Sequence, residues 1–370
     1  MRPGATLGIL GGGQLGRMIA NEARRLGYKV AVMDPGEDCS ARGAADIFIQ
    51  GRFDDADAVQ RLAAVSDVVT LETEHIPAEA LEKIQDKPLR PHAKVFWHIQ
   101  DRLRQRELLT SLAIPQPKWA PVGNAEEAKA AAATCGIPAI LKSRRGGYDG
   151  KGQIRLKEGD DPAAAHADMG VPAVMEQFIP FDYEISVLTA RGVDGEAADY
   201  PVAKNEHRGG ILHITTAPTE LPAELEAKAH DIARRIADGL DHVGMLCVEM
   251  FVVGSELLVN EVAPRVHNSG HYTLGACVTN QFEQHARAVL GLPLGDTTQM
   301  RPAAMLNLLG DSWANGDPDW QPFLAAAGTN LHLYGKAEAR PGRKMGHVTI
   351  LAESVDEARQ QAERLHALRA

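Results

Sequence analysis

The stretch LCVEMFVVGSELLVNEVAPRVHNSGH, residues 246–271, decides the fold of this chain. Two apolar runs meet at Gly254 and Ser255, which predicts a hairpin with strands over 245–253 and 256–262. Pairing across this turn sets Glu249 almost opposite Glu261. Two buried like charges at that separation oppose folding unless a cation neutralises them, so the hairpin predicts a cation site.

Magnesium suits such a pair, because Mg²⁺ takes one or two carboxylates and completes its octahedron with phosphate oxygens and water. A protonated pair, or a pair neutralised by Arg265, is the alternative. Asn260 adds a neutral ligand or a ribose contact. In the loop that follows, Arg265, His267, Asn268 and His271 predict an anion-binding and proton-handling cluster. The two histidines have helical metal-ligand spacing, but the glycine between them disfavours zinc.

Composition bounds the class of protein. The 370 residues predict two or three packed domains. The net charge of -10 argues against a general phosphate-neutralising surface for nucleic acid. The four cysteines lack CxxC spacing, which fits a reducing compartment. No apolar run approaches the roughly 20 residues that span a bilayer, so we expect a soluble, cytoplasmic enzyme that acts on small molecules.

The N-terminal hundred residues alternate short apolar runs with amphipathic helical patterns, which predicts a parallel sheet with covering helices. Gly11, Gly13 and Gly16 form a GxGxxG turn, and Asp34 ends the next strand, as in a dinucleotide site. An NAD-binding oxidoreductase therefore stays an alternative, as does a turn that only packs helix on strand. In TLETEHI, residues 70–76, Glu74 is a candidate partner for a hydroxyl or amine, with a solvated surface pair as the alternative.

The segment IPAILKSRRGGYDGKGQ, residues 137–153, places Lys142 at a strand end before a glycine-rich loop. Such a loop brings backbone N–H groups close to phosphate oxygens, so a phosphate lid is favoured over a polar hairpin. In MEQFIPFDYEISV, residues 175–187, Glu176 and Glu184 lie on successive strands around Pro180, and a ribose diol suits Glu184. Residues 176–179 offer backbone groups to an adenine edge.

The segment YGKAEARPGRKMGH, residues 334–347, concentrates basic residues in an acidic protein. A phosphomonoester site is one interpretation, since Arg and Lys converging on a loop hold such groups. A solvated hairpin is the other. The basic residues are Lys336, Arg340, Arg343 and Lys344. Between the lid and the hairpin, the pattern predicts strands over 184–190 and 196–203, and beyond the hairpin it predicts strands near 305–308, 330–334 and 347–352 with a closing helix.

These motifs, in order from Gly8 to about Ile350, resemble the 5-(carboxyamino)imidazole ribonucleotide synthases of the ATP-grasp superfamily. The resemblance implies a mixed α/β and α+β architecture. Its parts are an N-terminal Rossmann-like parallel-sheet domain, a central ATP-grasp lid and core, and a small C-terminal β-rich domain. The expected divisions are 1–100, 101–295 with the lid at about 115–190, and 296–370.

The resemblance also implies site residues by group. The expected ATP contacts are Arg102, Lys142, Gly147, Tyr148, Asp149, Gly150, Lys151, Gly152, Gln153, Glu176, Gln177, Phe178, Ile179, Glu184, His207, Asn260 and Glu261. The expected Mg²⁺ ligands are Glu249 and Glu261. The expected contacts to the phosphoribosyl substrate are Gln14, Leu15, Glu74, Asn268, Lys336, Arg343 and Lys344. The expected catalytic groups are Arg265, His267 and Lys336.

The implied reaction is ATP-dependent carboxylation of 5-aminoimidazole ribonucleotide with bicarbonate, through carboxyphosphate, in purine biosynthesis by a homodimer. Leu71, Thr73 and His75 stand where the family pattern has aromatic and Asn neighbours, and Lys204 stands where an acidic residue is expected. Three rivals remain: the related formate-using ligase that makes formylglycinamide ribonucleotide, the NAD-binding oxidoreductase, and a nucleotide sensor without catalysis.

Overall fold

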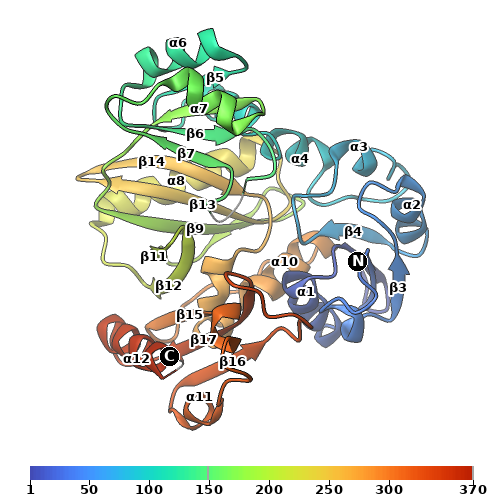
Figure 1. The fold of residues 1–370 in the computed structure, drawn as a ribbon. Coiled ribbons are helices and arrows are strands. Elements are labelled where there is room, and N and C mark those ends of the chain that lie inside the picture. Colours follow the sequence, from blue (N-terminus) through green and yellow to red (C-terminus); the bar gives the residue numbers. More distant parts are fainter. Residues whose placement is uncertain (148–149, 369–370) are drawn as a thin grey trace.

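Three β-sheets carry the described part of the chain, residues 1–147 and 150–368 of this computed structural model. Figure 1 shows a small parallel sheet in the N-terminal lobe, an antiparallel sheet in a second lobe, and a large sheet that joins the centre of the molecule to its C-terminal part. Residues from the N-terminal lobe, the second lobe and the large sheet line one shared cavity.

The N-terminal lobe is the predicted parallel sheet, with strand order β3-β2-β1-β4. Helix α1 starts directly after the glycine turn and ends before Gly27, whose φ of 87° suits a residue without a Cβ. The elements are β1 (Thr6–Leu10), α1 (Gln14–Arg25), β2 (Lys29–Asp34), η1 (Arg42–Ala44), β3 (Ile47–Gln50), α2 (Ala56–Ala64) and β4 (Val68–Leu71).

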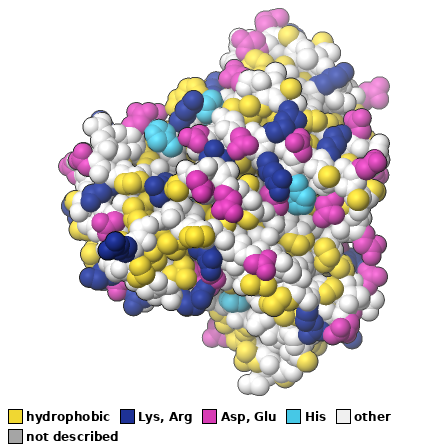
Figure 2. Space-filling view, turned by 180° about the vertical axis from the view of Figure 1, so that it is seen from behind, with side chains coloured by type: hydrophobic (Ala, Val, Ile, Leu, Met, Phe, Trp, Pro, Cys, Tyr) yellow, Lys and Arg dark blue, Asp and Glu magenta, His cyan; other side chains and the backbone are white. Residues whose placement is uncertain are grey.

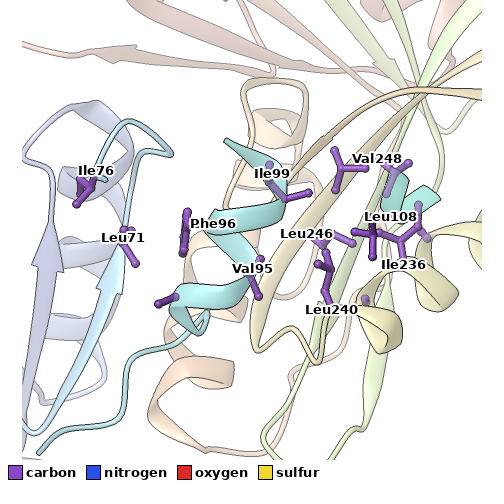
Figure 3. Close-up of a cluster of buried hydrophobic side chains, with 14 of the residues drawn as sticks. Leu71, Ile76, Val95, Phe96, Ile99, Leu108, Ile236, Leu240, Leu246 and Val248 are labelled. Carbon is purple, nitrogen blue, oxygen red and sulfur yellow. The ribbon is translucent and has the colours of Figure 1, made fainter. Parts of the chain in front are cut away.

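Three short helices connect this lobe to the centre: α3 (Ala78–Leu81), α4 (Ala93–Ile99) and α5 (Arg102–Ser111). Figure 3 shows α4 between the two regions, with Phe96 toward Leu71 on one side and Ile99 toward the central strands on the other. Leu246 and Val248 belong to the same buried cluster. The N-terminal lobe is therefore packed on the central sheet through a continuous apolar core.

The second lobe, the lid, is an antiparallel sheet of order β5-β8-β6-β7 with its own apolar core. Helices α6 and α7 pack against each other and against its strands. Lys142 lies near the end of β6, before the glycine-rich loop, as predicted. The elements are β5 (Trp119–Val122), α6 (Ala125–Cys135), β6 (Ala139–Ser143), β7 (Gln153–Leu156), α7 (Pro162–Met169) and β8 (Ala173–Gln177).

Among the described residues the third sheet has nine strands, and its neighbouring strands pair antiparallel. Its central elements are β9 (Tyr183–Arg191), β10 (Ala197–Asp199), β11 (Ala203–Arg208), β12 (Ile211–Ala217), α8 (Ala223–Gly239), β13 (Gly244–Val253), β14 (Glu256–Ala263), η2 (Asn268–Tyr272), α9 (Thr273–Ala276) and α10 (Gln281–Leu290). Its C-terminal elements are β15 (Ala303–Leu309), η3 (Gly310–Trp313), α11 (Gln321–Ala325), β16 (Thr329–Leu333), β17 (Lys344–Leu351) and α12 (Val355–Ala367).

Pairing of β12 with β15 makes the C-terminal strands continue the central sheet, although they also have a separate apolar core with α12. The single strand predicted over 196–203 is wrong: β10 and β11 are separate strands around Pro201, whose nitrogen has no hydrogen to donate to a ladder. Strand β12 was not predicted. Among the described helices, none is long and apolar enough to cross a membrane.

Candidate active site

A cavity of about 520 Å³ lies where the lid, the N-terminal lobe and the large sheet meet. The face in Figure 2 carries acidic and basic side chains interspersed rather than gathered by sign, so the charge pattern that matters here is the local one inside this cavity. The predicted site residues that line it are Gln14, Leu15, Glu74, Arg102, Lys142, Gly147, Gly150, Gln153, Glu184, His207, Glu249, Asn260, Glu261, Arg265, His267, Asn268 and Lys344.

The hairpin of β13 and β14 places Glu249 directly across from Glu261, and the chain turns at Gly254 and Ser255 as predicted. Burial raises the pKa of Glu249 to about 7, while the charge of His207 opposes this rise and that of Glu261 adds to it. The carboxylate of Glu249 is thus held at a cost within the protein. A cation between the two carboxylates would remove that cost.

Arg265, the alternative partner for this pair, is engaged elsewhere. The Nη2 of Arg102 lies 3.7 Å from the carboxylate of Glu261. Among the described residues, no group of three or more His, Cys, Asp or Glu is arranged to hold a metal. A site formed by Glu249 and Glu261 would therefore suit an ion that completes its shell with ligand phosphates and water, as Mg²⁺ does.

Glu176 lies on strand β8 of the lid and is 2% exposed. Its carboxylate accepts from Arg106 Nε at 2.8 Å and lies 2.7 Å from Lys142 Nζ. Burial acts to raise the pKa of Glu176, but the charges of Arg106, Lys142 and Arg102 outweigh it and hold the pKa well below its usual range. Glu176 therefore fixes the position of Lys142, whose Nζ also donates to Asn260 Oδ1 at 3.3 Å.

Arg106 is a residue that sequence reasoning missed. It is 0% exposed and ties α5 to β14 by donating to the carbonyls of Val259 at 2.9 Å and Asn260 at 2.7 Å. A buried arginine inside a helix has no local sequence signature, because its partners come from strands 70 and about 150 residues further along the chain. Arg106 therefore joins helix α5, the lid strand β8 and the hairpin strand β14 next to Lys142.

Glu184 and His207 face each other on β9 and β11, with Oε2 of the glutamate 2.5 Å from Nδ1 of the histidine. Burial alone would lower the pKa of His207, but the hydrogen bond to Glu184 prevails and raises it. The nearby Glu249 also favours the protonated ring. This pair adds a polar wall to the cavity next to the carboxylate hairpin.

The loop after the hairpin presents Arg265 and His267 to the cavity. Arg265 binds Glu74 in bidentate fashion, through Nε and through Nη2, the latter at 2.8 Å. Burial opposes ionisation of Glu74, yet Arg265 lowers its pKa to about 2. Burial, assisted by the charge of Arg265, lowers the pKa of His267 to about 3, and its Nδ1 lies 2.8 Å from Ser269 Oγ. His267 is therefore a neutral imidazole at pH 7.

The glycine turn at the N-terminus is already occupied by a carboxylate. Glu72 accepts from the N–H groups of Gly13 at 2.8 Å and Gly16 at 2.9 Å, which is where a dinucleotide phosphate would bind a helix N-terminus. Asp34 accepts from Gly12 N–H at 2.7 Å instead of meeting a ribose. Glu72 and Glu74 are held by the protein, so the solvated-pair interpretation is wrong.

The basic residues of the segment 334–347 lie in two places, some at or beside the cavity and others at the protein surface. Lys344 lines the cavity. Lys336 lies beside it, donating to the Lys344 carbonyl at 2.7 Å, and burial lowers the pKa of Lys336 to about 8. Arg343 donates to the Glu338 carbonyl at 2.8 Å, and Arg340 pairs with the Glu338 carboxylate at the surface.

Asn268 is 8% exposed and lines the cavity, yet within the described chain neither atom of its side-chain amide has a hydrogen-bond partner. Buried amides are normally satisfied, so this one is available to a ligand in the cavity. Other predicted contacts lie elsewhere. Tyr148 and Asp149 fall outside the described residues. Those described but not in the cavity lining are Lys151, Gly152, Glu176, Gln177, Phe178, Ile179, Lys336 and Arg343.

The four departures from the family pattern have ordinary local contacts. Thr73 Oγ1 accepts from the N–H of His75 at 3.3 Å, a turn that leads out of β4, and both residues line the cavity. Leu71 is a buried core residue at the end of β4. Lys204 lies with its Nζ 4.8 Å from the centre of the Tyr183 ring.

Three family models match the chain in order. They are a ribonucleotide synthetase preATP-grasp domain over residues 4–100, an ATP-grasp domain over 107–282, and a phosphoribosylaminoimidazole carboxylase C-terminal domain over 303–361. The chain is 43% identical to the N5-carboxyaminoimidazole ribonucleotide synthase of Bacillus subtilis, over 96% of this chain and 93% of that protein. The Brucella melitensis protein of that name is also 43% identical, over 94% and 97%.

Solved structures agree. The N5-carboxyaminoimidazole ribonucleotide synthetase of Thermus thermophilus superposes with a TM-score of 0.91 at 41% identity and covers 98% of both chains. The synthase of Aspergillus clavatus, solved with ADP and 5-aminoimidazole ribonucleotide, superposes with a TM-score of 0.92 at 31% identity, over 100% of this chain and 99% of that one.

Proposed function

This chain belongs to the family of N5-carboxyaminoimidazole ribonucleotide synthases, and we propose that the cavity described above is the site of that family's reaction. The chain is an ATP-dependent carbon–nitrogen ligase with the ATP-grasp fold, and it converts 5-aminoimidazole ribonucleotide to its N5-carboxy product in purine biosynthesis. The single observation that carries the site assignment is the cavity shared by the lid, the Glu249/Glu261 hairpin and the Arg265–Asn268 loop.

ATP lies, in this proposal, between the lid and the large sheet. Lys142 supplies a point charge to the phosphates, and the glycine loop after it closes over them. Arg102 Nη1 supports this placement, because within the described chain it is buried without a hydrogen-bond partner. Glu184, held by His207, faces the ribose. The strand end at residues 176–179 meets the base with backbone groups.

Glu249 and Glu261 hold Mg²⁺ in this proposal. The raised pKa of Glu249 fits, since a cation would remove the repulsion that produces it. Bound there with the nucleotide, the ion neutralises negative charge on the transferring phosphoryl group. Arg102, beside Glu261, and Lys142, beside Asn260, act on the same charge.

The phosphoribosyl substrate occupies the end of the cavity formed by the N-terminal turn and the basic hairpin. Asn268 offers an unsatisfied buried amide, and Lys344 offers a cation in the cavity wall. Lys336 and Arg343 lie just behind Lys344. Gln14 and Leu15 close the opposite side, beside Glu74. This arrangement suits a phosphomonoester with an attached hydroxylated sugar.

Bicarbonate is the carboxyl source in this proposal, through carboxyphosphate formed by phosphoryl transfer from ATP. The exocyclic amine of the acceptor then takes the carboxyl group, either by direct attack that expels phosphate or from CO₂ that carboxyphosphate releases together with phosphate. Arg265, orientated by Glu74, holds the anionic intermediate, and His267 is the proton carrier for the amine. Lys336 adds positive charge close to the reacting groups. Closure of the lid excludes the water that would hydrolyse carboxyphosphate.

The test is ADP release with each substrate omitted in turn. We expect release that requires both bicarbonate and 5-aminoimidazole ribonucleotide, and a loss of about 100-fold in kcat for Lys336→Ala. ADP release with formate and glycinamide ribonucleotide, without the other pair, would overturn the assignment. A change in NADH fluorescence on mixing, with no response to Mg-ATP, would favour an oxidoreductase instead.

Three further expectations belong to the proposal. They are a cytoplasmic location, a homodimer, and domain divisions at 1–100, 101–295 and 296–370. The acidic composition and the scattered cysteines support the first. Family membership supports the second, and sedimentation equilibrium at two loading concentrations tests it. The lid sheet, which spans Trp119 to Gln177, supports a lid at about 115–190.

A further inference from the structure

A buried glutamine holds the loop that carries His267. Gln281, the first residue of α10, is 0% exposed. Its Oε1 accepts from the His267 N–H at 2.9 Å, and its Nε2 donates to the His267 carbonyl at 2.8 Å. Both backbone groups of His267 are thus paired with one side chain, as a neighbouring strand would pair them.

The same amide extends to a second histidine. Gln281 Nε2 lies 3.0 Å from His271 Nδ1, so its second hydrogen is donated there and the His271 proton is on Nε2. The His271 ring contacts that of His347, with centroids 4.5 Å apart. His347 Nδ1 lies 2.8 Å from the hydroxyl of Tyr334. Tyr334 precedes Lys336 by two residues in the sequence. Hydrogen bonds on either side of this buried ring contact therefore link His267 to the strand end that precedes Lys336.

The geometry around the amide leaves little freedom. A Cβ on Gly270 would clash with Gln281 Oε1 and with the Leu188 side chain, so this close approach of loop and glutamine requires glycine. The backbone N–H of Gln281 donates to Thr273 Oγ1 at 3.0 Å, which anchors the start of α10 to the end of the same loop. The first residue of α10 therefore holds both ends of the loop that runs from His267 to Thr273.

We propose that Gln281 is a positioning residue for this reaction. It sets the place of His267 and, through His271, His347 and Tyr334, aligns the part of the C-terminal hairpin that bears Lys336. Gln281 lies behind the cavity wall and not in its lining, so it acts through these groups and not on the substrate. The inference rests on the proposed function, in which His267 and Lys336 serve one reaction.

The chain provides a matched control on the same helix. Gln284 is also 0% exposed and clamps one backbone residue from both sides: its Nε2 donates to the Gly295 carbonyl at 2.9 Å, and its Oε1 accepts from the Gly295 N–H at 2.7 Å. Gly295 lies in the connection after α10 and does not line the cavity. Loss of either clamp has a similar structural cost.

The experiment compares Gln281→Met with Gln284→Met. We expect similar losses of thermal stability in both. Only Gln281→Met is expected to lose activity, with kcat lower by about 10- to 100-fold and the KM for ATP within about twofold of wild type, because a displaced proton carrier slows chemistry more than nucleotide binding. Equal kcat values in the two variants would overturn the proposal.

Amide hydrogen exchange separates this inference from the proposed reaction. We expect the peptide that contains residues 265–271 to exchange at least about tenfold faster in Gln281→Met than in wild type, and to be unchanged in Gln284→Met. Absence of ADP release by the wild type would refute the proposed reaction, yet the exchange data would still show whether Gln281 holds the loop. Unchanged exchange in Gln281→Met would refute the clamp itself.

Discussion

Two pairs of glutamates face the same cavity and differ in what satisfies them. Glu72 accepts two N–H groups of the glycine turn, although burial outweighs them and raises its pKa, and Glu74 binds Arg265, which lowers the pKa of Glu74 to about 2. Glu249 lies across from Glu261 with less compensation, and its pKa rises to about 7. Glu74 and Glu249, which face one cavity, thus have pKa values shifted in opposite directions.

The difference shows that a carboxylate pair indicates a cation site only when the protein leaves its charge uncompensated. The first pair is structural support for the turn and for Arg265. The second pair is costly in the protein by itself, which is the condition that a bound cation relieves.

The largest expected effect comes from Glu249→Gln. Removal of the uncompensated charge weakens metal binding, so ADP release falls by about 100-fold or more. The metal-free protein becomes more stable, by about 1 to 3 kcal/mol at pH 8, because the raised pKa reflects an unfavourable charge that the variant lacks. Steady-state ADP release and chemical denaturation in the presence of a chelator measure the two quantities. A variant that is both less active and less stable would show that Glu249 has a protein partner.

Glu74→Gln is expected to change stability in the opposite direction. The substitution leaves the buried guanidinium of Arg265 without its counter-charge, which lowers the free energy of unfolding by about 2 to 4 kcal/mol. Denaturation with a chelator present, as for Glu249→Gln, keeps the two variants comparable. If Glu74→Gln were as stable as wild type, the pairing with Arg265 would be unimportant and the contrast between the two pairs would fail.

The smallest expected effect is the pH dependence of that loss. The pKa of Glu74 is lowered in the folded state to about 2 from 4.5, so its contribution is complete above pH 4.5 and is lost as the pH falls toward 2. The stability difference between wild type and Glu74→Gln should therefore shrink by about 1 kcal/mol between pH 7 and pH 4. Buried His242 and His285, with pKa values lowered by burial to about 4 and about 3, destabilise both proteins alike in acid. A difference that is constant over this range would contradict the assigned pKa.

Sequence reasoning predicted features that depend on neighbouring residues. Alternation and turn residues predicted the parallel sheet, and the Gly254–Ser255 turn predicted the register that pairs Glu249 with Glu261. The strand predicted over 196–203 was wrong because one proline divides it. The ATP-grasp fold itself was predicted from the resemblance of several motifs to a known family, and not from the hydrophobic periodicity of any one segment.

Features that depend on distant partners escaped prediction. Arg106 is a helix residue like others until Glu176 and two β14 carbonyls meet it. Glu72 could be recognised as the ligand of the glycine turn only once β4 lay beside β1. Gln281 likewise gains its partners from a loop before its own helix. The roles of the site residues remain proposals that measurement must test.

The most direct test of the contrast is Mn²⁺ binding with ATP present, followed by electron paramagnetic resonance. Mn²⁺ is the probe because it accepts the same oxygen ligands as Mg²⁺. Wild type and Glu74→Gln should bind with affinities within about threefold of each other, while Glu249→Gln should bind at least about tenfold more weakly. Unchanged Mn²⁺ affinity in Glu249→Gln, or a loss confined to Glu74→Gln, would contradict the assignment of the metal to the hairpin.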